Sequence, residues 1–185
     1  MRPPIVALAA LSLAACGSAE EPAASPTAAT GMAETSPTTS NGTATDAESY
    51  ATMAGASDLF EIQSSQLALE KSQNAGVREF AQMMIDHHRK TTEQVTTAAR
   101  EAGMTPAAPQ LTSMQRDNMT GLQAASGADF DRIYLEQQRQ AHQMALALHQ
   151  EYAQDGDTPQ LQEVARTAVP IIQQHMEQAQ ALTAS

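Results

Sequence analysis

The chain has 185 residues, and its formal net charge is −11 because 21 Asp and Glu side chains outnumber 10 Lys and Arg side chains. This acidic balance argues against binding to nucleic acid, which needs clustered Lys and Arg. Only 3% of the residues are aromatic, which favours helices packed through small side chains over a β-sandwich, and the single Cys excludes an internal disulfide or a Cys-based zinc site.

Residues 1–15 are predicted to be a signal peptide. Arg2 provides a short positive start, and residues 5–15 are apolar apart from Ser12. An apolar run of this length is too short to span a bilayer as a helix, which needs ~20 residues. It has the length that is typical of a signal-peptide core, so we expect the protein to be exported.

The signal ends in Leu13-Ala14-Ala15-Cys16, and small residues before a lone Cys resemble a bacterial lipobox. The resemblance implies cleavage before Cys16, diacylation of its thiol and acylation of the new amino terminus, although an ordinary signal with an incidental Cys is the alternative. Two or more acyl chains anchor a protein stably. In such lipoproteins, an Asp directly after the Cys often retains the protein at the inner membrane, and this chain has Gly17 at that position. We therefore expect a lipid anchor in the outer membrane, facing the periplasm, and the sequence identifies no protein partner.

Residues 16–56 are predicted to be a disordered acidic tether. The segment is rich in Ala, Ser, Thr and Pro, contains acidic but no basic side chains after Cys16, and has few apolar residues larger than Ala. Such a composition buries too little surface to offset the loss of chain entropy on folding. A short helix over residues 47–53 remains an alternative, and the folded domain is expected at residues 57–183.

Helical periodicity begins at Ser57 and predicts an all-α domain. Asp58 and Glu61 are spaced like a capping box at the start of the first helix, and Pro159 follows Thr158 as the first residue of the last helix. Two hairpins joined by a longer crossover with a short helix are typical of a ferritin-like four-helix bundle. The expected helices cover residues 58–73, 77–102, 110–125, 128–154 and 159–182.

Several stretches of the bundle match a known family pattern. They are residues 67–71, residues 80–87, residues 127–135, and Val169-Pro170 followed by His175, together with Glu61 and His142. On these stretches the chain resembles the ferritin-like "domain of unknown function 4142" family of exported bacterial proteins. The resemblance implies the bundle fold and an envelope location, and it implies no established activity.

A layer of Glu61, His87, His142 and His175 is the candidate site. The helical rise of ~1.5 Å per residue puts Glu61, His87 and His142 at similar heights in the predicted bundle, and His175 roughly 6 Å beyond them. Imidazoles and a carboxylate inside a bundle are potential ligands of a divalent metal ion such as Zn, Fe or Cu. The alternative is a buried hydrogen-bonded layer without metal, in which Glu61 fixes the register of the helices.

The remaining two imidazoles, His88 and His149, are expected to be partly exposed. No acidic residue stands three positions before any His, so the Glu-x-x-His motifs of a di-iron ferroxidase are missing. We predict no catalytic residue. The leading interpretation is a non-catalytic bundle with an interaction or stress-related role. The alternative is a metal-binding or metal-dependent redox protein that uses the His/Glu layer.

Overall fold

A computed structural model describes residues 45–183 of the chain. Those residues contain helices and no strand, which confirms the all-α prediction. Within the described range, no helix combines the length and the apolar character that crossing a membrane requires. The predicted signal peptide, Cys16, Gly17 and the tether up to residue 44 lie outside the described residues, so they stay predictions.

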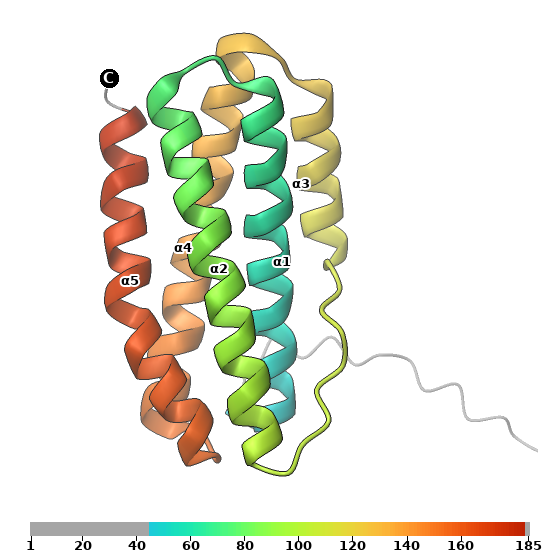
Figure 1. Cartoon of the computed structure of the whole chain (residues 1–185), viewed down its shortest axis with the longest axis vertical. Helices are drawn as coiled ribbons and strands as arrows, with labels where there is room; N and C mark the ends of the chain where they lie inside the picture. Colours follow the sequence, from blue (N-terminus) through green and yellow to red (C-terminus); the bar gives the residue numbers. More distant parts are fainter. Residues whose placement is uncertain (1–44, 184–185) are drawn as a thin grey trace, which may run out of the picture. The chain divides into compact units, whose positions relative to one another are not determined.

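Two helical hairpins build the bundle (Figure 1). The first hairpin pairs α1 (Ala47–Lys71) with α2 (Ala75–Glu101), and the second pairs α4 (Gly127–Asp155) with α5 (Pro159–Thr183). Contacts of α2 with α5 and of α1 with α4 close the four-helix arrangement. The crossover carries α3 (Ser113–Ala124) along the outside of α1, and it returns the chain so that α4 runs parallel to α2 (Figure 1).

Local signals in the sequence set most helix ends. The side chain of Asn74 accepts hydrogen bonds from the backbone N–H groups of Gly76 and Val77 and caps α2. Gly103 follows the end of α2 with a φ of 82°, a conformation that only glycine adopts without strain. The expected start of the last helix at Pro159 agrees with the structure.

The start of α1 differs from the prediction. The helix begins at Ala47, where the Asp46 side chain accepts a hydrogen bond from the Ser49 N–H at 2.8 Å, so residues 47–56 belong to the bundle and not to the tether. Tyr50 explains the extension, because its ring is fully buried and stacks on Tyr152 with 3.9 Å between ring centroids. Asp58 is consequently a buried residue inside the helix and not its cap.

The core consists of two large apolar clusters along the bundle, a small third cluster of Ala145, Ala168 and Ile172, and buried polar residues between the two large clusters. One cluster contains Tyr50, Val95, Tyr152 and Leu161. The other contains Val77, Phe80, Met84, Leu122, Phe130 and Tyr134. On each long helix, buried polar side chains occupy positions between the residues of the two clusters, and these are Asp58, Glu61, Ser64, Ser65, His88, Gln138, His142 and His175. Buried polar groups need partners, so this layer is where the fold concentrates its specific interactions.

Candidate metal centre

His88 projects from α2 into the middle of the bundle and is only 7% exposed. It lies four residues after Met84 and seven before Val95, so the helical period puts it on the core face with them. Its Nδ1 atom is 2.7 Å from Oδ1 of Asp58 on α1, and Thr92 donates to the other carboxylate oxygen at 2.9 Å. Its Nε2 atom is buried without a hydrogen-bond partner, and is therefore available to a ligand.

His142 lies on α4 and is 1% exposed. Its Nδ1 atom is 2.7 Å from the backbone carbonyl oxygen of Gln138, one turn earlier. Because a carbonyl oxygen can only accept, Nδ1 carries the proton and donates it. The lone pair of the ring is therefore on Nε2, which lies 3.1 Å from Nδ1 of His175.

His175 of α5 lies between His142 and His87. Its Nδ1 atom meets His142, and its Nε2 atom is 2.8 Å from Nδ1 of His87 on α2. The rings of His87 and His175 stack with 5.1 Å between centroids and an angle of 22°. His175 is 1% exposed, whereas His87 is half-buried at the edge of the bundle, so His87 supports the interior ring from outside.

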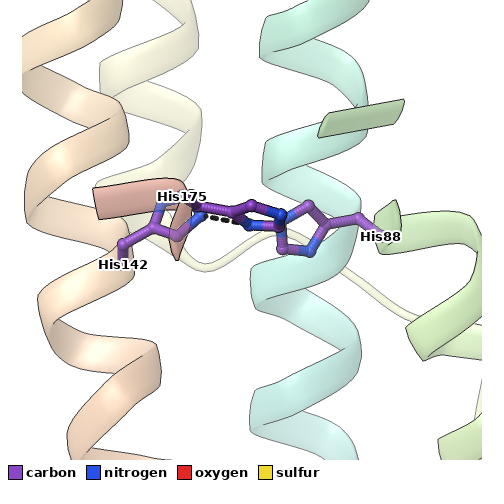
Figure 2. A group of neighbouring side chains, drawn as sticks. All are labelled: His88, His142 and His175. Atoms are coloured by element: carbon purple, nitrogen blue, oxygen red, sulfur yellow. Dashed lines mark hydrogen bonds between the residues drawn. The ribbon is translucent and has the colours of Figure 1, made fainter. Parts of the chain in front are cut away.

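His88, His142 and His175 form the histidine triad of the bundle. One ring nitrogen of each lies within 4.8 Å of those of the other two, and the rings approach one another from α2, α4 and α5 (Figure 2). The outer nitrogen of each ring is held by a different partner, namely Asp58, the Gln138 carbonyl or His87. Metal-binding histidines are oriented by such outer hydrogen bonds. Metal–imidazole distances are about 2.0–2.1 Å, so the three rings would have to move closer together to hold one ion.

Glu61 of α1 borders the triad and is 1% exposed. Neither of its carboxylate oxygens has a hydrogen-bond partner, and Oε1 is 3.5 Å from Nδ1 of His142. Burial raises the pKa of Glu61 to about 8, although the positive charge on His88 opposes the rise. An unpartnered buried carboxyl group is costly, and a cation in the layer reduces that cost.

The imidazoles of the triad differ in their protonation. Burial lowers the pKa of His142 to about 3 and that of His175 to about 2, and repulsion from neighbouring histidines adds to both shifts. Burial alone also lowers the pKa of His88, but the hydrogen bond and charge of Asp58, together with the charge of Glu61, raise it overall. Two of the three rings are therefore neutral at pH 7, the form that binds metals.

A small cavity of about 10 Å³ lies beside the triad. Its walls include Asp58, His88, His149 and His175. This volume is close to the minimum that one water-sized particle occupies, so the cavity accommodates a single ion or water.

The four residues of the predicted layer come together, in a different arrangement from the expected one. Glu61, His142 and His175 are buried side by side, and His87 reaches the layer through His175. The three side chains close enough to share a metal ion are His88, His142 and His175, so this group adds His88 to the predicted set and lacks both His87 and Glu61. That these residues bind a metal remains a prediction.

Two expectations about the other histidines are wrong. His88 and His149 are 7% and 4% exposed and not partly exposed. The signal for His88 was present in its spacing from Met84 and Val95. His149 is buried because its Nδ1 atom pairs with the hydroxyl of Tyr50 at 2.9 Å, and Tyr50 lies in the segment that we assigned to the tether.

Comparison with known proteins bears on the family and the fold. A family model described as "Domain of unknown function (DUF4142)" matches residues 32–182, which confirms the resemblance seen in the sequence. None of the curated proteins compared with the chain matches it.

Several solved structures share the fold. CopM in its Cu(II)-bound form superposes with a TM-score of 0.63 at 15% identity, over 74% of this chain and 95% of CopM. Its silver-bound form gives a TM-score of 0.62 at 16% identity, over 74% and 94% of the two chains. A DUF305 fragment from Deinococcus radiodurans gives 0.65 at 17% identity, over 74% and 93%. At such low identity these likenesses concern the fold alone.

Proposed function

The chain belongs to the DUF4142 family, and we propose that its bundle is a non-catalytic metal-binding domain that holds one copper ion at His88, His142 and His175. The observation that carries the proposal is the convergence of three buried ring nitrogens within 4.8 Å of one another. Without metal, the buried Nε2 atom of His88 has no hydrogen-bond partner, which lowers the stability of the folded state, and binding to a metal ion would remove this penalty.

The surroundings of the triad fit a metal ion. Each ring is oriented by an outer partner, and the buried rings of His142 and His175 stay neutral at pH 7. Glu61 lies beside His142, and its pKa of about 8 leaves it mostly protonated at pH 7 without metal. A bound cation would favour the ionised carboxylate, which would balance part of the charge of the ion. The residues of this chain would therefore supply the ligands, their orientation and a compensating negative charge.

Copper is the metal we favour among those that imidazole suits, which include zinc, iron and nickel. The CopM structures, which share the fold, contain copper in their Cu(I)-bound and Cu(II)-bound forms. Imidazole binds copper in both oxidation states, so the triad accommodates either. Zinc is the competitor to include in every binding measurement, because it takes the same ligand type.

The site is better suited to binding a metal ion than to catalysing a reaction on a substrate. The triad is enclosed, with each imidazole at most 7% exposed, and the adjoining cavity of about 10 Å³ has no room for an organic substrate. We further propose that the domain works in the bacterial envelope, attached to the outer membrane through lipid on Cys16. The small residues before Cys16 support lipid attachment, and Gly17 after it supports the outer membrane.

Metal analysis of purified variants tests the copper site. We expect the wild-type protein to retain one Cu(II) ion per chain after loading with Cu(II) and desalting, and His142→Ala or His175→Ala to weaken binding by at least about tenfold. Ser65→Ala is the matched control, because Ser65 is as buried as the triad yet hydrogen-bonds to Tyr134. Equal copper retention by all four proteins would contradict the proposal. If no protein bound metal and His142→Ala and His175→Ala were only less stable, the polar layer would instead serve to fix the register of the helices.

A further inference from the structure

Three exposed methionines surround one groove on the surface of the bundle. Met53 on α1, Met114 on α3 and Met144 on α4 all line a cavity of about 210 Å³. Their side chains are 45%, 51% and 51% exposed, and among the described residues only Ile171 joins them as an exposed large hydrophobic side chain. The fold therefore brings thioethers from three separate helices to a single place.

Packing does not explain this grouping. Methionine ordinarily fills irregular gaps in a core, where its flexible side chain is buried. The other methionines of residues 45–183 follow that habit, since Met84 is fully buried and Met83, Met104, Met119 and Met176 are half-buried. The three groove methionines leave about half of their surface in solvent, so their positions need another reason.

The chemistry of the groove selects one kind of ligand. No charged side chain lines it, and its remaining walls are apolar residues such as Phe60 and Leu148 together with neutral hydroxyl and amide groups. Among these, Gln137 has an amide oxygen without a hydrogen-bond partner. Sites for hard cations such as Ca²⁺ or Mg²⁺ usually include carboxylate ligands, which this groove lacks, whereas thioether sulfur is a soft ligand that prefers Cu(I) and its analogue Ag(I).

We propose that Met53, Met114 and Met144 form a surface site for a soft monovalent cation, Cu(I) or Ag(I), distinct from the histidine triad. Ser57 and Ala145 line both the methionine groove and the small cavity beside His88 and His175, so the two cavities are neighbours in the bundle. The proposal stands on its own residues and does not require that the triad binds copper.

Silver titration of a triple variant tests the methionine site. Replacing Met53, Met114 and Met144 together with Leu removes the sulfur atoms and nearly conserves side-chain volume, so the bundle should fold as before. Followed by calorimetry, wild-type protein should bind one more Ag(I) ion per chain than this variant. The matched control replaces the half-buried Met83, Met119 and Met176 with Leu, and it should retain the wild-type stoichiometry.

A second set of measurements distinguishes this site from the triad and remains informative if the triple variant does not fold. X-ray absorption of wild-type protein loaded with one equivalent of Ag(I) should show sulfur ligands, and single Leu variants at each groove position should weaken Ag(I) binding. Zinc, which thioethers bind poorly, should be bound equally by wild-type protein and the triple variant, while His142→Ala affects only the triad. Unchanged Ag(I) stoichiometry in the triple variant, or an equal loss in the control, would overturn the proposal.

Discussion

The ring nitrogens of His142 and His175 lie 3.1 Å apart, Nε2 to Nδ1, and join α4 to α5 in the interior of the bundle. Because Nδ1 of His142 donates to the Gln138 carbonyl, its Nε2 accepts, and the proton between the rings belongs to His175. A metal ion bound by Nε2 of His142 and Nδ1 of His175 would need the lone pair of each nitrogen. The hydrogen bond between the two rings and a bound metal therefore exclude each other. His175 would then carry its proton on Nε2, facing His87.

Asp58→Asn tests the outer partner of His88. Removing the carboxylate charge makes the ring a weaker base and lowers the pKa of His88, because the hydrogen bond and charge of Asp58 are what raise it. We expect copper affinity to fall by about 10–100-fold, measured by competition with a chelator of known affinity. Asp86→Asn is the control, since Asp86 is exposed and hydrogen-bonds to Gln82 on the same helix. Equal affinities in the two variants would rule out a role for Asp58.

Tyr50→Ala tests the early start of α1. The variant loses a fully buried ring that stacks on Tyr152, so the free energy of unfolding in urea should fall by about 3–5 kcal/mol. Tyr50→Phe keeps the ring but leaves Nδ1 of His149 unpartnered, and should cost about 1–3 kcal/mol. The exposed Thr52→Ala on the same turn is the control. If Tyr50→Ala lowered the free energy of unfolding no more than Thr52→Ala does, the first turns of α1 would not stabilise the bundle.

Burial of His149 should make the metal-free protein less stable as the pH falls below about 6.5. Burial lowers the pKa of His149 to about 4 in the folded state, while the unfolded chain titrates near 6.5. Between these pH values the unfolded chain binds a proton that the folded chain does not. The contribution of His149 to the free energy of unfolding is therefore fully present above pH 6.5 and falls by roughly 3 kcal/mol towards pH 4. His142 and His175 act in the same direction. Glu61 and His88 act in the opposite direction, because their raised pKa values make the folded state bind their protons more tightly.

His149→Gln isolates this contribution, because the amide does not titrate. Unfolding free energies at pH 7 and pH 4.5 should differ less in the variant than in the wild-type protein. The control is His87→Gln, which removes a half-buried imidazole. The same pH dependence in wild-type and His149→Gln proteins would show that His149 does not stay neutral in the folded state.

Cys16→Ser tests the predicted lipid anchor. Without the thiol no acyl chains are attached, so the protein should move from the membrane fraction to the soluble fraction on cell fractionation. Ser18→Ala, two residues beyond the predicted anchor, serves as the control and should stay with the membranes. Unchanged membrane association of Cys16→Ser would refute the lipoprotein prediction.

The sequence by itself determined the fold class and most of the helix ends. These features depend on short-range patterns, such as Pro159 after Thr158, Gly103 after α2, and the helical spacing of apolar residues. Counting residues along the helices also predicted that Glu61, His142 and His175 would share one layer, because the rise per residue is fixed.

Only the tertiary structure decided which imidazoles face the centre and where α1 begins. Neighbours on a helix such as His87 and His88 point about 100° apart, so a small rotation of α2 against α1 and α5 selects which one is enclosed. The start of α1 depends on Tyr50 finding His149, 99 positions away along the chain. Partners so distant leave no local pattern, and the stabilisation that they give a helix end exists only once the bundle has assembled.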